Sequence, residues 1–334
     1  MNASPIRHGR RSFLAQAAGA LASGLALPGT GFAQGEAYPA RPVKVVCNFP
    51  AGSSPDALVR AIALPMQQAL GQPVVIDNRA GASGMIGAEL VAKAPPDGYT
   101  LLMTAGSTIT TNPHVFAKMP FDAARDLVPV AAVARLNLFL VTRGDFPAGN
   151  VREFLAYLKA HPGKVTYGSA GNATGLHLAG EMLKGQAGVF AVHVPYRGAS
   201  LALQDLLAGQ IDFYFDPGIA LQQVKAGKLK LLAVGAPQRS PLYPDVPTLS
   251  EAGLKGFDAG TTHGLYAPAG TPAAVIERLN REVNAALVQP NVKAQIATLA
   301  AEPTPMTPAQ FETVMREDSR RYGAVIRERH ITAT

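Results

Sequence analysis

The stretch Val43 to Leu70, VKVVCNFPAGSSPDALVRAIALPMQQAL, decides the fold class. Its first seven residues form a short apolar run rich in β-branched side chains, which is typical of a buried strand. A turn of small residues follows, and after it Leu58, Ile62 and Met66 recur at helical spacing. Strand, small-residue loop and helix in this order form the repeating unit of an α/β fold.

Local signals predict the limits of this helix. Ser54 is expected as the N-cap, Pro55 as the first helical residue and Asp56 beside the positive end of the helix dipole. Gly71 follows the last apolar position and predicts the C-terminus. Pro65 lies inside the helix and predicts a kink.

The same alternation continues along the chain. Capping boxes at Asn150 with Glu153 and at Thr307 with Gln310 predict helices beginning near 151 and 308, and Thr271-Pro272 opens another. Further strands are expected near residues 74–77, 101–105, 128–133, 138–142, 165–169, 211–215, 229–234 and 263–267. Helices between most of these strands predict largely parallel sheets.

Composition excludes several classes of protein. The chain has 334 residues, enough for two domains, with 48% hydrophobic and 16% charged residues, so it is neither disordered nor fibrous. The 30 basic and 23 acidic residues are spread along the chain, without the basic clusters of a nucleic-acid binder. Cys47 is the only cysteine, so no intramolecular disulfide forms, and we expect a buried, inert thiol rather than a lipid anchor.

The first 33 residues have the pattern of an export signal. A basic start precedes the apolar stretch Phe13 to Leu27, and small residues end the segment at Ala33, so we expect the mature chain to begin at Gln34. The pair Arg10-Arg11 stands before Phe-Leu, which indicates the twin-arginine route, with an ordinary Sec signal as the alternative. Both routes place the protein in the periplasm. No apolar run beyond this segment is long enough to span a membrane.

Three loops share one design, in which a strand runs into Gly, Ser, Thr or Asn and then into a helix. They are residues 50–56, residues 106–112 and the long loop that begins at Gly168. Glycines allow close approach, and helix N-termini offer unpaired N–H groups and partial positive charge, so together the loops predict an anion-binding cleft. Each loop alone is also explained as an ordinary capped turn.

Enzyme templates fit less well. No phosphate-binding G-x-x-x-x-G-K-[ST] segment and no G-x-S-x-G elbow is present, and the histidines lack metal-ligand spacing. His177 is read as a helix-start hydrogen-bonding residue rather than a base. Asp216 is open between a ligand contact and a helix cap. For Arg197, in HVPYRGAS, we expect a solvated charge rather than an anion clamp.

The chain resembles the tripartite tricarboxylate transporter receptors, the Bug-type periplasmic binding proteins. The resemblance is carried by YPARPVKVVCNFPAGSSPDALVR, LGQPVVIDNRAGASGMIGAELVAKAPPDGYTLLM, VTYGSAGNATGLHLAGEML, HVPYRGASLALQDLLAGQID and LLAVGAPQRSPLYPDVPTLSEAGL. It implies an α/β type II periplasmic-binding fold whose two α/β domains enclose a carboxylate ligand. We further expect a monomer without cofactor, metal or enzyme activity, whose partners would be a small and a large integral membrane subunit.

The resemblance assigns domains and contacts. Domain 1 would comprise residues 34–136 and 254–334, and domain 2 residues 137–253. The implied ligand contacts are Phe49, Ala51, Gly52, Ser53, Asp56, Ser107, Thr108, Ser169, Ala170, Asn172, Thr174, His177 and Asp216.

The chain departs from the family pattern at two places. Ser53 and Ser54 stand where the family has glycines, and Thr262-His263 stands where it has Trp-Tyr. The ligand class is therefore left open. A periplasmic enzyme acting on a small organic acid, with His177 or Asp216 as base, is the alternative function.

Overall fold

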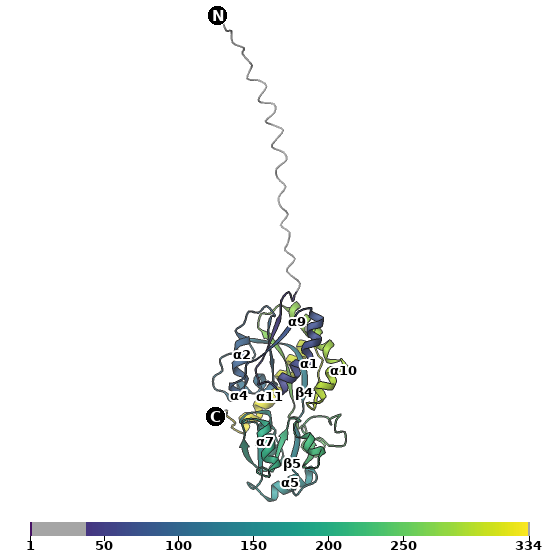
Figure 1. The fold of residues 1–334 in the computed structure, drawn as a ribbon. Coiled ribbons are helices and arrows are strands. Elements are labelled where there is room, and N and C mark those ends of the chain that lie inside the picture. Colours follow the sequence, from purple (N-terminus) through teal and green to yellow (C-terminus); the bar gives the residue numbers. More distant parts are fainter. Residues whose placement is uncertain (2–37, 333–334) are drawn as a thin grey trace. The chain divides into compact units, whose positions relative to one another are not determined.

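The computed structural model describes Met1 and residues 38–332. The predicted export signal, with Arg10-Arg11 and its cleavage site, lies outside the described residues and stays a prediction. Residues from Pro39 onward form a unit built on two mixed sheets with helices packed against them (Figure 1). Within the described part of the chain, no helix is long and apolar enough to cross a membrane.

The first sheet has six strands in the order β11-β4-β10-β3-β1-β2. β1 pairs in parallel with β2 and β3, whereas β10 is antiparallel to β3 and β4. The strands are β1 (Val43–Cys47), β2 (Val74–Asn78), β3 (Thr100–Thr104), β4 (Leu127–Leu136), β10 (Thr261–Pro268) and β11 (Ala301–Pro303).

The second sheet has five strands in the order β7-β6-β8-β5-β9. β6 is parallel to β7 and β8, and β5 is antiparallel to β8 and β9. The strands are β5 (Phe139–Arg143), β6 (Thr166–Ser169), β7 (Val192–Pro195), β8 (Phe213–Asp216) and β9 (Leu229–Val234). Only Asn137 and Leu138 separate β4 from β5, so the chain passes directly from one sheet to the other and returns between β9 and β10.

Helices follow most strands, as the alternation predicts, but the expectation of largely parallel sheets is wrong, because five of the nine strand pairings within residues 38–332 are antiparallel. They are α1 (Ser54–Leu70), α2 (Met85–Ala92), α3 (Gly106–Thr110), α4 (Asn112–Val115), α5 (Val151–Ala160), α6 (Gly175–Ala187), α7 (Ala199–Leu207), α8 (Leu221–Lys225), α9 (Ala273–Leu287), α10 (Pro290–Ala297) and α11 (Pro308–Glu328), with a 3-10 turn at Ala82–Gly84.

The predicted helix limits hold with one correction. The N-cap of α1 is Ser53 rather than Ser54, because Ser53 keeps the extended backbone that precedes a helix. Gly71 ends α1 with a left-handed φ of 67°, and α1 is one element through Pro65. The capping box of Thr307 with Gln310 is confirmed at the start of α11.

Two strands were not predicted. β7 has four residues with no fully buried side chain, and β11 has three. Both lie at the edge of a sheet, where one side of the strand needs no partner and a continuous apolar run is not required. Short edge strands of this kind therefore lack the sequence signal on which the other strands were recognised.

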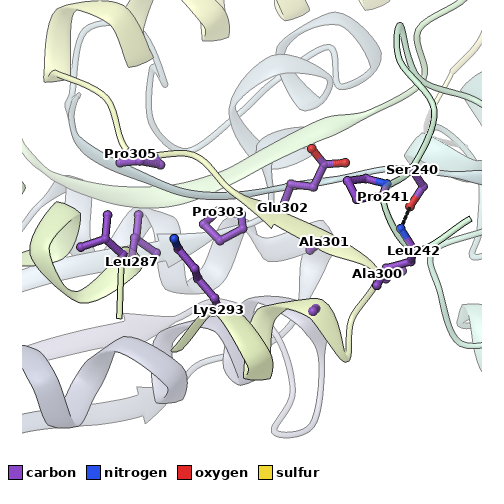
Figure 2. A pocket seen from close by; sticks show the side chains of 12 residues that line it. Ser240, Pro241, Leu242, Leu287, Lys293, Ala300, Ala301, Glu302, Pro303 and Pro305 are labelled. Atoms are coloured by element: carbon purple, nitrogen blue, oxygen red, sulfur yellow. Dashed lines mark hydrogen bonds between the residues drawn. The ribbon is translucent and has the colours of Figure 1, made fainter. Parts of the chain in front are cut away.

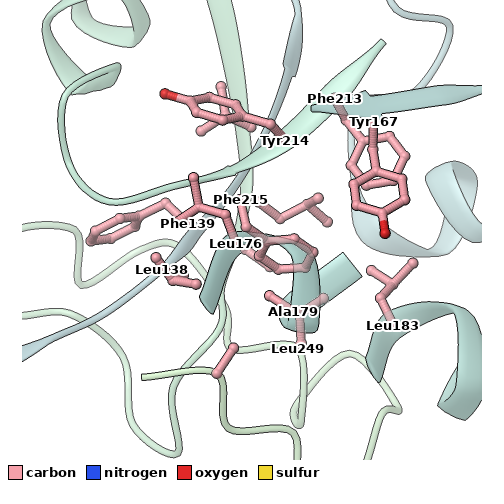
Figure 3. Close-up of a cluster of buried hydrophobic side chains, with 14 of the residues drawn as sticks. Leu138, Phe139, Tyr167, Leu176, Ala179, Leu183, Phe213, Tyr214, Phe215 and Leu249 are labelled. Atoms are coloured by element: carbon pink, nitrogen blue, oxygen red, sulfur yellow. The ribbon is translucent and has the colours of Figure 1, made fainter. Parts of the chain in front are cut away.

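Aromatic side chains fill the core of the second sheet (Figure 3). Tyr167 of β6 stacks on Phe213 of β8 with ring centroids 5.5 Å apart, and Leu176 and Leu183 of α6 belong to the same cluster. Gly180 permits this packing, because a Cβ there would lie 2.2 Å from the Tyr167 ring. α6 is thereby held against β6, the strand whose loop reaches the pocket described below.

Helix α11 contributes to both cores. Phe311, in its first turn, belongs to the cluster of the first sheet, whereas Tyr322 and Ile326 belong to that of the second. Between these positions, Arg321 Nη1 donates to Asp258 Oδ2 at 2.5 Å, and Asp258 also pairs with Arg135 at the end of β4. These ion pairs tie α11 to both segments that connect the sheets.

Candidate ligand-binding site

A pocket of about 1130 Å³ lies at the loops that follow the strands of both sheets. The first sheet contributes the loop after β1 and residues after β3, and the second sheet contributes the loops after β6, β7 and β8. Its lining includes residues 49–55, Ser83, Ala105, Ser107, Asn112, Phe116, Ala170, residues 172–174, residues 197–200, residues 217–219, Tyr243 and residues 297–300.

The strand directions explain why these loops meet. β1 and β3 are parallel, as are β6, β7 and β8, so within each parallel set the carboxyl ends lie at one edge. The N-terminal ends of α1, α6 and α7 consequently border the pocket through Ser54, the N-cap Thr174 and Ala199. A helix N-terminus favours a bound anion by about 0.3–1 kcal/mol when exposed.

Asp56 holds the loop after β1 in place by hydrogen bonds. Its Oδ2 accepts hydrogen bonds from the N–H of Gly52 and from Arg60 Nε, both at 2.9 Å, and its Oδ1 accepts from Asn78 at 2.9 Å. Burial alone would raise the pKa of Asp56, but these donors and the Arg60 charge hold the pKa at about 2. The carboxylate is therefore ionised and holds Gly52, which has a left-handed φ of 81°.

Asn48 and Asn112 hold the neighbouring wall. Asn48 Nδ2 donates to the carbonyl of Gly84 at 2.8 Å and approaches Thr108 Oγ1 at 3.4 Å, and both side chains are fully buried. Asn112 Nδ2 donates to the carbonyl of Ser83 at 2.9 Å. These bonds orient the turn at Ser83, which lines the pocket with a φ of 55°.

Two stacked histidines lie behind the loop after β6. The N–H of Ala173 donates to His177 Nδ1 at 3.0 Å, and the ring of His177 stacks on His193 with centroids 3.8 Å apart. His193 Nε2 lies 2.7 Å from Ser169 Oγ, which also accepts from the N–H of Gly171. Burial lowers the pKa of His177 and, with the nearby His177, lowers that of His193 to about 4. Both rings are therefore neutral near pH 7.

Asp216 holds the loop after β8. It is fully buried, pairs with the hydroxyl of Tyr214, and accepts from the N–H groups of Gly218 at 2.9 Å and Ala220 at 3.0 Å. Burial raises its pKa to about 6, against the lowering effect of these hydrogen bonds. Asp216 therefore holds the turn that precedes α8, whose N-cap is Ala220, and it is not among the residues that line the pocket.

Asp56, His177 and Asp216 have one arrangement in common. Each is buried and accepts a hydrogen bond from the backbone N–H of a pocket-lining residue with left-handed φ. The three donors are Gly52, Ala173 and Gly218, with φ of 81°, 61° and 105°. Ala173 is the non-glycine among them, and a left-handed conformation costs a residue with a Cβ roughly 1–2 kcal/mol.

The structure brings most predicted contacts to the pocket wall. Eight of the thirteen line it, namely Phe49, Ala51, Gly52, Ser53, Ser107, Ala170, Asn172 and Thr174. The other five, Asp56, Thr108, Ser169, His177 and Asp216, are buried and are not among the lining residues.

Sequence reasoning missed several lining residues. Ser83 lies in the small-residue run RAGASG, which offered a loop signal of the kind used elsewhere, and Asn112 ends a loop that was recognised. Tyr243 and residues 297–300 carry no such signal, because they reach the pocket only through folding of distant segments.

The lining carries positive charge. Arg197 and Lys225 are its charged residues, and no Asp or Glu lines it. Arg197 is exposed and makes no hydrogen bond or ion pair within the described part of the chain. It stands beside the N-terminus of α7, where a cation is disfavoured by the helix dipole. An anion in the pocket would pair with the Arg197 charge and would offset its unfavourable interaction with the helix dipole.

Ser53 offers an unused hydroxyl. Its Oγ is buried and has no hydrogen-bond partner within the described residues, and as N-cap of α1 it makes no side-chain capping bond. Buried polar atoms are normally paired. Since Ser53 lines the pocket, this unpaired oxygen is a candidate ligand contact.

A second, smaller pocket has different chemistry (Figure 2). It measures about 380 Å³ and is lined mainly by apolar residues, among them Leu242, Leu287, Pro303 and Pro305, with Lys293 and Glu302 as its charged members. Glu302 is already bonded to Asn137 at 2.9 Å. The N-terminal ends of α1, α6 and α7 are absent from this lining. Because helix N-termini favour anions, the larger pocket is the better anion site.

Residues 38–332 contain no cluster of three or more metal-ligating side chains. Cys47 is a free, buried thiol in β1, and burial raises its pKa to about 11. It is therefore protonated at neutral pH, in line with the inert thiol expected from sequence.

Comparisons with known proteins agree with this geometry. Residues 58–331 match the profile described as "Tripartite tricarboxylate transporter family receptor". Protein BugT of Bordetella pertussis is 35% identical over 296 residues, covering 88% of this chain and 90% of BugT.

Two solved structures are similar over most of their length. R. palustris Rpa4515 with adipate is 32% identical with a TM-score of 0.80, covering 88% of this chain and 99% of that one. MatC (Rpa3494) from Rhodopseudomonas palustris with bound malate is 34% identical with a TM-score of 0.75, covering 86% and 100%. With the two mixed sheets, these likenesses confirm the predicted α/β type II periplasmic-binding fold.

Proposed function

Because the chain belongs to the tripartite tricarboxylate transporter receptor family, in the Bug-type group, we propose that it is a periplasmic receptor for a small organic carboxylate. The observation that carries the proposal is the charge of the pocket wall, which has Arg197 and Lys225 but no acidic residue. Three helix N-termini and the free hydroxyl of Ser53 add donors for a carboxylate. The bound adipate and malate of the two relatives make C4 to C6 dicarboxylates the first candidates.

The proposed contacts are the eight predicted residues that line the pocket, together with Ser83 and Asn112. Asp56, His177 and Asp216 lie behind the lining residues. There they accept hydrogen bonds from the backbone N–H groups of Gly52, Ala173 and Gly218. Ligand capture takes place between two domains, residues 34–136 with 254–334 and residues 137–253. A small and a large integral membrane subunit would then receive the ligand, or the receptor would serve sensing.

A thermal-shift screen over mono-, di- and tricarboxylates tests the function. An acid at a hundredfold excess over its Kd stabilises the folded protein by about 2.7 kcal/mol, which raises Tm by several degrees. The diamide of the best acid is the matched ligand control, because it presents N–H donors to a wall of donors. If no acid raises Tm, or if the diamide binds equally well, the proposal fails.

Ser53→Ala tests the site itself. Because Ser53 Oγ has no partner within the described protein, the variant should keep its Tm and lose about fivefold to tenfold in affinity. Thr174→Val is the matched control: the Thr174 hydroxyl donates to the carbonyl of Gly171 at 2.8 Å, so this variant should lose stability as well. Calorimetric titration and thermal unfolding separate the two results.

The alternative, an enzyme acting on the same acid, is less well supported, because neither His177 nor Asp216 lines the pocket. Recovery of the bound acid unchanged after prolonged incubation distinguishes a receptor from an enzyme. Export is tested separately by changing Arg10 and Arg11 to Lys. This should retain the precursor in the cytoplasm if the twin-arginine route operates, whereas normal export indicates the Sec route.

A further inference from the structure

We propose that the stacked pair His177 and His193 holds the loop 169–174 in its ligand-binding conformation only while both imidazoles are uncharged, so that acid weakens ligand binding. The inference rests on the proposed function, because this loop lines the proposed carboxylate site. It concerns two positioning residues rather than ligand contacts.

The first step is the hydrogen bond to Ala173. His177 Nδ1 accepts the N–H of Ala173 at 3.0 Å, so Nδ1 carries a lone pair and no proton. Protonation would place an N–H at Nδ1, and two donors would then face each other. An imidazolium retains no acceptor, whereas a protonated carboxyl keeps one. His177 therefore differs from Asp56 and Asp216, which hold Gly52 and Gly218 in the same way.

The second step is the conformation that this bond holds. Ala173 has a φ of 61°, in the left-handed region that disfavours a residue with a Cβ. Gly52 and Gly218, whose N–H groups are held by Asp56 and Asp216, adopt such angles without this penalty. Loss of the His177 bond should therefore allow Ala173 to leave its conformation, and the loop would lose the geometry of its N–H groups.

The third step is the neighbour of His177. The two rings are nearly parallel, 3° apart, with centroids at 3.8 Å, so two positive charges there would repel strongly. His193 holds the other end of the loop, since its Nε2 lies 2.7 Å from Ser169 Oγ and Ser169 accepts the N–H of Gly171. Both ends of the loop thus depend on the same pair.

Burial lowers the pKa of both rings; of the charged groups around the pair, Glu181 raises it and Lys184 lowers it, and the lowering effects prevail. Glu181 Oε1 lies 3.8 Å from His177 Nε2, but it is already paired with Lys184 Nζ at 2.6 Å and with the hydroxyl of Tyr167 at 2.6 Å. Tyr167 also stacks on His193 with centroids 4.9 Å apart, and it presents a neutral phenol. Acidification therefore charges the pair without a free counter-ion nearby.

Two variants test the inference with adipate as the probe. His177→Asn keeps an acceptor oxygen near the position of Nδ1 and does not titrate, and Ala173→Gly removes the conformational penalty. Because adipate itself titrates in acid, the measured quantity is the ratio of wild-type to variant affinity at each pH. From about pH 7.5 to about pH 4.5 this ratio should fall about fivefold or more for both variants. A change of this size corresponds to the loss of one hydrogen bond in the wild type.

His161→Gln is the matched control, because His161 lies at the exposed end of α5 and contacts Tyr157 rather than the pocket. It should follow the wild type at every pH. A ligand-free readout is the amide exchange of Ala173, which should accelerate in acid in the wild type beyond its intrinsic pH dependence and not in His177→Asn.

A constant affinity ratio for both variants, or Ala173 exchange that follows only its intrinsic pH dependence, would overturn the inference. If His177→Asn does not fold, Ala173→Gly and the wild-type exchange profile decide alone. If adipate and the other acids fail to bind at any pH while Ala173 exchange still responds to acid, the proposed function is wrong and the coupling of the histidine pair to the loop stands.

Discussion

The Nε2 atom of His263 lies 3.3 Å from the Oγ atom of Ser54, and this contact joins β10 to the first turn of α1 at the edge of the pocket. His263 is 3% exposed, and its Nδ1 has no partner among the described residues. By the resemblance described in the sequence analysis, Ser54 and His263 are also positions at which the chain departs from the family pattern. The two departures, 209 residues apart in sequence, therefore meet in space.

The first prediction is that Ser54 and His263 act as a unit in ligand binding. Ser54→Ala and His263→Phe should each lower affinity by about threefold to tenfold, because the first removes the hydroxyl at the pocket wall and the second removes the ring nitrogen that orients it. The double variant should lose no more than either single variant, since the interaction is already absent. Isothermal titration of the four proteins measures the coupling, and additive losses would show that the two residues act independently.

The second prediction concerns stability in acid. Burial lowers the pKa of His263 from 6.5 to about 3, so between these values the unfolded chain binds a proton that the folded chain does not. The stability that the neutral ring contributes is present above pH 6.5 and is lost as pH falls. From pH 7 to pH 5 the wild type should lose about 2 kcal/mol relative to His263→Phe. Urea unfolding at both values measures this, and equal losses in the two proteins would contradict it.

The third prediction concerns the brace beneath the first loop. Asp56→Ala removes the acceptor of Gly52, Arg60 and Asn78, so the free energy of unfolding should fall by about 1.5–3 kcal/mol. Affinity should fall with it, because Gly52 loses its anchor. Asp56→Asn is the control, since it keeps an acceptor for Gly52 and should recover part of both losses. An Asn variant as weak as the Ala variant would show that the charge matters rather than the hydrogen bond.

The fourth prediction concerns Arg197. Its exposure implies a contribution below about 1 kcal/mol, so Arg197→Ala should weaken binding less than about fivefold. The loss should appear in the association rate and should vanish at high salt, because an exposed charge acts by steering. Stopped-flow association at low and high salt tests this. A loss of binding that salt does not diminish would identify Arg197 as a direct clamp.

Much of the architecture follows from local pattern. β-branched runs, capping residues and small-residue loops predicted nine of the strands, the starts of α5 and α11 and the three loops that reach the pocket, because these signals depend on neighbours a few residues apart. The resemblance added which fold these elements build. β7 and β11 were not predicted, because short edge strands need no apolar run.

The sequence by itself thus determined the order of elements and the kind of loop at the site, whereas the eight predicted residues of its wall came from the family resemblance. Only the tertiary structure decided which predicted residues face the pocket and which stand behind it. Asp56 in α1, His177 in α6 and Asp216 at the end of β8 adjoin the loops of the lining residues, but they are buried and accept backbone N–H groups of those loops. The contacts of His177 with His193 and of Ser54 with His263 join separate elements, and no local pattern contains such a distance.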